Sequence, residues 1–183
     1  MKKEIKDERK VELFVGDLFK LPLKDNSIDI VYTFHALEPN GGNEKPLIRE
    51  LYRIARKYLI FIEPSFEIAS EEGKERMIHH GYIMNLQEHI NSLGYEIIKI
   101  EPFGLDANPM NPAQTILVKK CNNDTDNNNV SDPLCDPITG SDLERIGNAL
   151  YSPEALLSYP IINGVPCLLE NYAVVTTKMK QYQ

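Results

Sequence analysis

The sequence predicts an α/β protein with a mostly parallel sheet, followed by a small β-rich unit. Short, β-branched apolar runs alternate with stretches of helical period over residues 11–119. An Asn/Asp-rich segment, 121–131, then interrupts the pattern, and hairpin signals replace helical ones beyond it. The 183 residues, 42% of them hydrophobic, suffice for one ordinary core and a smaller appendage.

Three apolar runs in the first part of the chain have the composition of strands. Residues 11–16 form a short β-rich run, and the Gly-Asp pair at its end is typical of a strand that enters a binding loop. Residues 28–34 are almost uniformly apolar, which predicts a central parallel strand covered on both faces. Residues 58–62 predict a second buried strand, which Glu63-Pro64 ends.

Two stretches, one after the second of these runs and one after the third, have apolar residues at helical spacing. Leu47, Leu51 and Ile54 stand at i, i+4 and i+7 with charged residues between them, so one stripe faces a core. Residues 86–93 repeat such a stripe, and Gly94 stands where a left-handed cap would end the helix. Both stretches are therefore predicted to be helices.

Two further strands complete the expected sheet, and a hairpin signal follows in the second unit. Strands are expected at residues 95–100 and 114–119, and the short link between them predicts that the last strand runs antiparallel. Beyond the linker, two apolar runs flank Asn163-Gly164, a strong hairpin signal because both residues tolerate positive φ. We therefore expect an α/β domain over residues 1–120, a linker over 121–131 and a β-rich module over 132–183.

Charge and cysteine content exclude several classes of function. The net charge of −7 offers no basic field for a nucleic acid, and no apolar run approaches the length of a membrane helix. The start of the chain lacks the apolar segment of a signal peptide, so a cytoplasmic protein is expected. Cys121, Cys135 and Cys167 fit no metal-binding template, and we expect no metal site.

The segments "VGDLFKLPLKDNSIDIVYTFHALE" and "LIRELYRIARKYLIFIEPS" resemble the middle of class I S-adenosylmethionine-dependent methyltransferases, of the type 11 kind. That family has a Gly-Asp at the end of its third strand, Leu-Pro, an acidic turn, and Asp-x-Val on its fourth strand. The resemblance runs over residues 11–119. It implies a Rossmann-like sheet of strand order 3-2-1-4-5-7-6, with S-adenosylmethionine as cofactor and a small-molecule or glycan-like methyl acceptor.

The resemblance also implies that this sheet is incomplete. The first recognisable strand matches the family's third, and no Gly-x-Gly, the loop that follows strand one, occurs in the sequence. Strands one and two are thus missing, and the chain looks truncated. We expect weak or absent cofactor binding by the isolated chain. The strand at 28–34 would lack its usual neighbour on one edge. Either the strand at 11–16 docks directly against it, or another chain, a protein partner or a second copy, supplies the pairing, or the polypeptide is a fragment of a longer enzyme.

The end of the chain resembles the small zinc-ribbon-like module that activates tRNA and protein methyltransferases. Its Tyr-Pro-Ile-x-x-Gly-x-Pro-x-Leu core is intact in "YPIINGVPCLLE". In that family a Cys-Pro-x-Cys pair opens the module, whereas Asp132 stands at the position of the first cysteine here. The departure agrees with the expected absence of a metal.

The resemblance assigns roles to residues that follow the strands. Cofactor contacts are implied for Asp17 and Leu18, beside the adenine, and for Thr33 and Phe34; the alternative for Asp17 is a turn residue. The catalytic candidates, nearest the transferred methyl, are His35 and Glu38. His35 is either the base that accepts a proton or a residue that caps the strand and packs on the cofactor.

Further polar residues are expected at the same edge of the sheet, because the carboxyl ends of parallel strands meet there. Those that would bind the acceptor are Asn40, Glu63, Glu67, His80 and Tyr82. The alternative is that Asn-Gly-Gly is a turn, that Glu63-Pro64 ends a strand, and that the two adjacent histidines, His79 and His80, lie on a helix surface.

Two functions from different classes are consistent with the sequence. The first is a methyltransferase acting on a small acceptor. The second is a non-catalytic, methyltransferase-like partner or activator that binds another protein through its open sheet edge and its last module. A nucleotide-dependent oxidoreductase fits less well, because its dinucleotide loop would also require Gly-x-Gly-x-x-Gly.

Overall fold

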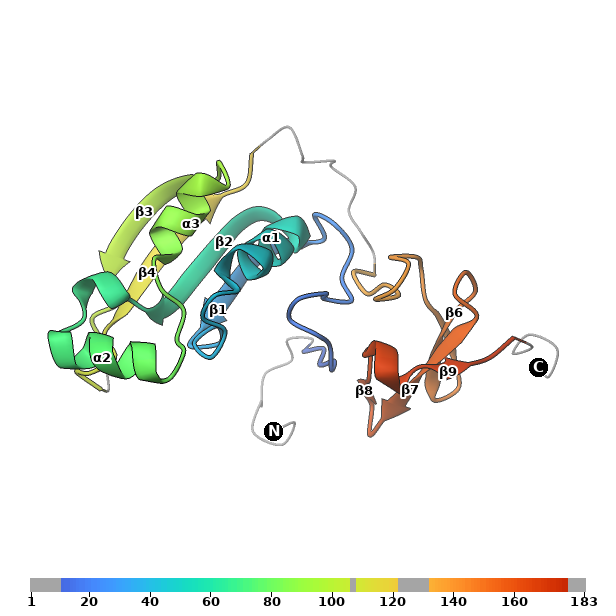
Figure 1. The fold of residues 1–183 in the computed structure, drawn as a ribbon. Helices are drawn as coiled ribbons and strands as arrows, with labels where there is room; N and C mark the ends of the chain where they lie inside the picture. Colours follow the sequence, from blue (N-terminus) through green and yellow to red (C-terminus); the bar gives the residue numbers. More distant parts are fainter. Residues whose placement is uncertain (1–10, 106–107, 122–131, 178–183) are drawn as a thin grey trace. The chain divides into compact units, whose positions relative to one another are not determined.

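The computed structural model describes residues 11–105, 108–121 and 132–177 (Figure 1). The chain divides into two compact units. One, here called the α/β unit, is Leu23–Pro133; the other, the terminal unit, joins Met1–Pro22 to Leu134–Gln183. Within the described ranges, no helix has the length and apolar character that crossing a membrane requires.

The α/β unit contains a four-stranded mixed sheet of order β1-β2-β4-β3. β1 pairs with β2 in parallel, whereas β4 is antiparallel to both β2 and β3. The last strand is antiparallel, as predicted, but only one of the three strand pairings is parallel, so the described sheet is mixed and not mostly parallel. The order equals the 4-5-7-6 part of the order that the resemblance implies. The strands are β1 (Ile28–Phe34), β2 (Ala55–Pro64), β3 (Glu96–Pro102) and β4 (Ala113–Lys119).

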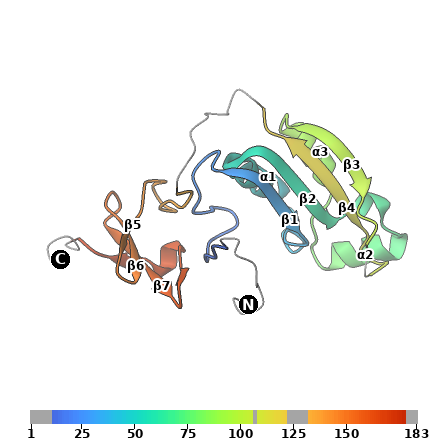
Figure 2. The same ribbon diagram turned by 180° about the vertical axis from the view of Figure 1, so that it is seen from behind.

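Two helices lie where the apolar stripes predict them, α1 (Glu44–Ile54) and α3 (Leu86–Ser92). A third helix, α2 (Glu71–His79), was not predicted, and a short 3-10 turn, η1 (Phe66–Ile68), precedes it after β2. Gly94 has a φ of +76° and ends the last of these helices, as predicted. Helices α1 and α3 pack on one face of the sheet (Figures 1 and 2). The core between them includes Leu47, Ile48, Leu51, Leu59, Phe61, Ile90, Ile116 and Val118.

The prediction that β1 is a central strand covered on both faces is wrong for the described part of the chain. Its only described strand partner is β2. Val31 and Thr33 are buried on the helix side, whereas Ile30, Tyr32 and Phe34 are 52%, 69% and 53% exposed. The apolar composition of the strand could not predict this exposed face, because composition does not indicate whether another layer covers each face of a sheet.

The prediction that residues 11–16 form a strand of the α/β sheet is also wrong. Val15 instead forms an isolated parallel bridge with Cys167 in the terminal unit. Its amide donates to the carbonyl of Pro166, and its carbonyl accepts from the amide of Leu168, each at 2.8 Å. A short β-rich run specifies extended backbone but not the strand with which it pairs.

The terminal unit is a small antiparallel sheet of order β5-β6-β7-β8, with β9 paired to β7. Asn163 and Gly164, at φ of +51° and +79°, form the turn between β7 and β8, which confirms the predicted hairpin. Phe14 packs against its core, which includes Leu150, Tyr159, Ile161 and Leu168. The strands are β5 (Glu144–Ile146), β6 (Ala149–Ser152), β7 (Leu157–Ile162), β8 (Val165–Pro166) and β9 (Val174–Val175), with a 3-10 turn, η3 (Glu170–Tyr172), before the last.

Candidate functional site

The carboxyl end of β1 carries a histidine–glutamate pair. The backbone of His35 has a positive φ of +48° and its amide donates to the carbonyl of Ile62 at 2.9 Å. This left-handed residue reverses the chain directly after the strand. The Nδ1 atom of His35 contacts the Oε1 atom of Glu38, which leaves Nε2 of the same ring for another partner. The structure thus brings together the two predicted catalytic residues.

A buried carboxylate fixes the turn that holds this pair. Glu63, at the end of β2, accepts hydrogen bonds from the amides of Ala36 at 3.1 Å and Leu37 at 3.2 Å. Burial raises the pKa of the Glu63 carboxyl, although Thr33, these two amides and His35 act in the opposite direction. Glu63 is only 2% exposed, so its role in the structure is to position the turn rather than to meet an acceptor.

Two loops of the α/β unit approach the pair from other elements. The Nδ2 atom of Asn111, in the loop before β4, lies 3.5 Å from Oε1 of Glu38. The carbonyl of Glu38 accepts from the amide of Ile83 at 3.0 Å, and the amide of Gly41 donates to the carbonyl of Gly81 at 2.9 Å. A side chain at position 41 would lie only 2.5 Å from the nearest backbone oxygen, so this close approach requires glycine.

Two aromatic rings lie beside the pair. The ring of Phe34 is 4.9 Å from that of His35 and 5.5 Å from that of Phe103, measured between centroids. The Phe34–Phe103 contact is edge-on, and the side chain of Phe34 is about half exposed. The exposed apolar surface next to a histidine suits a planar ligand.

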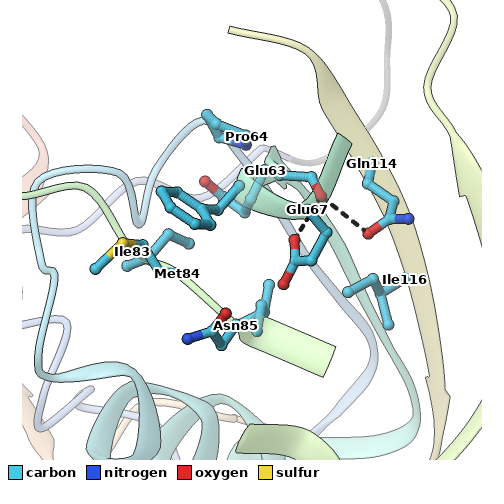
Figure 3. A pocket seen from close by; sticks show the side chains of 11 residues that line it. Glu63, Pro64, Glu67, Ile83, Met84, Asn85, Gln114 and Ile116 are labelled. Carbon is cyan, nitrogen blue, oxygen red and sulfur yellow. Dashed lines mark hydrogen bonds between the residues drawn. The ribbon is translucent and has the colours of Figure 1, made fainter. Parts of the chain in front are cut away.

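A small pocket opens next to the end of β2 (Figure 3). The hydroxyl of Ser65 donates to Oε2 of Glu67 at 2.7 Å and lies 3.3 Å from Oε1 of Gln114. The space inside the pocket suffices for about one water molecule, so it can hold neither a small-molecule acceptor nor a nucleoside cofactor.

The remaining predicted acceptor residues lie in two places. Asn40 is engaged in its own turn, because its Nδ2 atom donates to the carbonyl of Leu37 at 3.1 Å. His80 and Tyr82 follow α2, with ring centroids 5.8 Å apart, and Arg76 lies over the ring of Tyr82. Asn40 has the turn role that the sequence left open, whereas Tyr82 stays available as a binding residue.

Asp17 and Leu18, predicted to contact the adenine, belong to the terminal unit. The Oδ1 atom of Asp17 accepts from the amide of Phe19 at 2.9 Å, and its carbonyl accepts from the amide of Lys20 at 3.1 Å. These are the contacts of a turn residue, which was the alternative reading of Asp17. An open hollow beside this turn is lined by Asp17, Lys20, Pro137, Leu168, Leu169, Glu170 and Asn171.

Sequence reasoning missed Phe103 and Asn111, and it gave Arg76 no role apart from the polar and aromatic segment 76–82. Phe103 and Asn111 lie near the ends of the connection between β3 and β4, whose Pro-rich composition suggested only a link. The predicted antiparallel direction of β4 was the available signal. An antiparallel strand begins at the edge where its parallel neighbours end, so the loop before it reaches the same edge.

None of the three cysteines, which all lie in the described ranges, forms a disulfide; Cys121 is exposed and the other two are buried. Among the described residues, no group of three or more His, Cys, Asp or Glu side chains could hold a metal ion. The buried Cys135 and Cys167 pack in the terminal unit as small apolar side chains do.

Comparisons with known proteins were made on the sequence and on the fold. Residues 1–61 match the model of a family described as "Methyltransferase domain". The fold is similar to that of a SAM-dependent methyltransferase from Methanosarcina mazei, at a TM-score of 0.51 and 17% identity over 63% of this chain and 70% of that one.

A second similar structure is magnesium protoporphyrin IX methyltransferase from Synechocystis PCC 6803 with bound SAH. The TM-score is 0.42 at 14% identity, over 58% of this chain and 49% of that one. A comparison with curated proteins found no match. The first third of the chain thus matches a methyltransferase domain, and 63% of the chain has a fold similar to that of a SAM-dependent methyltransferase.

Proposed function

We propose that this protein takes part in the S-adenosylmethionine-dependent methylation of a small-molecule or glycan-like acceptor. The single observation that supports this best is the His35–Glu38 contact at the carboxyl end of β1. Both residues lie within the 61 residues that match a methyltransferase domain. Ligands of open α/β sheets bind at this edge, outside the carboxyl ends of the strands.

The proposed chemistry requires a base close to the nucleophile. In the tautomer that carries its hydrogen on Nδ1, His35 would donate to Glu38 and present Nε2 as an acceptor. That nitrogen would take the proton of an acceptor hydroxyl or amine as its oxygen or nitrogen is methylated. Asn111 would hold the carboxylate of Glu38 from the other side.

The residues of the α/β unit fit the cofactor only in part. Phe34 and Phe103 offer apolar surface for its base or ribose, whereas the side chain of Thr33 is buried on the opposite face of β1. When bound, S-adenosylmethionine would supply an electrophilic methyl group on a sulfonium. The sequence has no Gly-x-Gly turn to wrap the methionine part, and Asp17 and Leu18 belong to the other unit. We therefore expect weak binding.

Calorimetric titration with S-adenosylhomocysteine tests this proposal. We expect weak but saturable binding by the whole chain, reduced by Phe34→Ala and unchanged by Ile98→Ala, another half-exposed apolar residue of the sheet. A screen for methyl transfer would follow, with His35→Asn expected to lose turnover and to keep this binding. If the wild type shows no saturable binding even at millimolar ligand, the proposal fails.

A second candidate function is that of a non-catalytic partner, as the open edge of β1 suggests. In the described part of the chain, β1 pairs on one side only, and Ile30 and Tyr32 are more than half exposed. A strand from another polypeptide could add to this edge. Hydrogen exchange separates the two candidate functions. If the amides on the unpaired edge of β1 exchange rapidly, and this exchange slows at high protein concentration, the result supports the function as a partner. Concentration-independent exchange contradicts pairing with a second copy.

A further inference from the structure

Arg76 of α2 carries a positive charge for which the described residues provide no carboxylate partner. Its Nη2 atom donates a long hydrogen bond of 3.3 Å to the hydroxyl of Tyr82, and its guanidinium lies 5.4 Å from the centroid of that ring. Its other terminal nitrogen, Nη1, is buried and has no hydrogen-bond partner. A guanidinium stays charged, and a buried donor without an acceptor is costly, so this group requires an anion.

Two other arginines of the same unit, Arg53 and Arg56, are paired with carboxylates. Arg53 contacts Asp25 and Glu50, each at 2.7 Å, and Arg56 contacts Asp29 at 2.7 Å. The sequence has 27 acidic residues against 20 basic ones, so a shortage of carboxylates does not explain Arg76. The lack of a described carboxylate partner for Arg76 therefore needs another explanation.

The segment that carries Tyr82 is attached to the loop that carries Glu38. The amide of Ile83 donates to the carbonyl of Glu38 at 3.0 Å, and Gly41 and Gly81 are hydrogen-bonded at 2.9 Å. Arg76 and Tyr82 therefore lie on the elements that surround the His35–Glu38 pair, at the same edge of the sheet.

Asn111 adds a second group without a partner. Its Nδ2 atom faces Glu38 at 3.5 Å, whereas its Oδ1 atom is buried and accepts no hydrogen bond. Helix α2 packs on the same loop, because a side chain at Gly73 would lie 3.0 Å from the carbonyl of Met110. The unpartnered donor on α2 suits an anionic oxygen of a ligand, and the unpartnered acceptor on the adjoining loop suits a donor such as the hydroxyl or amine of the methyl acceptor.

We infer that Arg76 binds a carboxylate of the methyl acceptor, with the body of the acceptor against the ring of Tyr82. The inference rests on the proposed function for the identity of the ligand as an acceptor. A guanidinium presents parallel N–H groups that match the two oxygens of a carboxylate. Arg76 is partly exposed, so a rotation of its head group brings Nη1 to an entering anion. The acceptor is thus an acidic molecule with an apolar or aromatic body.

The probe for this inference is benzoate, with benzamide as the neutral molecule of the same shape. We would follow the arginine Nε–H resonances of the whole chain by NMR, without S-adenosylmethionine. The wild type is expected to bind benzoate about tenfold more tightly than benzamide, with a shift at the Arg76 resonance. Arg76→Gln should abolish this preference, whereas Arg49→Gln, at an exposed position of α1, should preserve it.

Three results would overturn the inference: equal binding of both probes by the wild type, undiminished benzoate binding by Arg76→Gln, or no binding of either probe. Stronger binding of inorganic phosphate than of benzoate would also contradict a carboxylate ligand. Tyr82→Phe retains the ring and serves as a second, milder variant if Arg76→Gln folds poorly. Because S-adenosylhomocysteine is absent, failure of the proposed cofactor binding would leave this titration unaffected, so the two failures are distinguishable.

Discussion

Val15 pairs with Cys167 in a parallel bridge, which joins the first described segment of the chain to the C-terminal part of the terminal unit. Both hydrogen bonds of the bridge, from Val15 to Pro166 and from Leu168 to Val15, measure 2.8 Å. Phe14 adds its side chain to the core of the same unit. The terminal unit is therefore built from both ends of the chain.

Replacing Val15 by proline should destabilise the terminal unit. Proline has no amide hydrogen for the carbonyl of Pro166, so a cost of about 1–3 kcal/mol is expected. Val15→Ala retains the amide and removes only an exposed side chain, so it should cost less. Urea denaturation followed by hydrogen exchange of β7 would measure both. Equal stability of the two variants would show that the bridge contributes nothing.

The buried Asp136 should stabilise the terminal unit at neutral pH and lose this effect in acid. Burial by itself would raise the pKa of its carboxyl, but hydrogen bonds from Ser152, Ile138, Tyr159 and Thr139 together lower it. A folded-state pKa below the unfolded value of 3.8 means that the stabilisation is present above pH 3.8. It is lost as the pH falls through the lower, folded-state pKa.

Asp136→Asn is thus expected to cost about 1–3 kcal/mol at neutral pH. The difference from the wild type should shrink as the pH falls below 3.8. Glu154→Gln, at an exposed position of the same unit, is the matched control and should change little. Thermal unfolding at several pH values would measure the effect. A difference that does not depend on pH would contradict the charged network.

Glu63 should show the opposite dependence on pH. Its folded-state pKa is raised above 4.5, chiefly by burial, so the folded protein holds the proton more tightly than the unfolded chain does. Stability should therefore fall as the pH rises from 4.5 towards the folded-state pKa.

Glu63→Gln removes this titration, so the variant should gain stability relative to the wild type as the pH rises. Its carboxamide keeps one acceptor for the amides of Ala36 and Leu37 and loses the other, which costs about 1 kcal/mol at low pH. Glu96→Gln, at an exposed position of β3, is the control. Chemical denaturation across the pH range would measure this. If the variant loses stability as the pH rises, Glu63 is not the destabilised acid described here.

Metal analysis tests the expectation that the terminal unit binds no zinc. We expect no zinc in the purified protein, and Cys135→Ser should leave the metal content unchanged at zero, because its described surroundings hold no cluster of ligands. Elemental analysis of protein purified without chelators would settle the matter. Stoichiometric zinc in the wild type that Cys135→Ser releases would reverse the conclusion.

Several elements could be predicted from the sequence because their signals are local. Residues 28–34 form a strand, Leu47, Leu51 and Ile54 mark one face of a helix, and Asn163-Gly164 forms a hairpin turn. Each pattern depends on the period or on the φ preference of a few neighbouring residues. The neighbourhood of His35 and Glu38 was predictable for the same reason, since the two residues stand only three positions apart.

The sequence by itself determined which segments are extended or helical, and that His35 and Glu38 directly follow a strand. Only the tertiary structure decided that residues 11–16 pair with the terminal unit, that one face of β1 stays exposed, and that Asn111 reaches Glu38 across 73 positions. Strand pairing and loop contacts depend on which surfaces meet at long sequence separation. No local period encodes that choice.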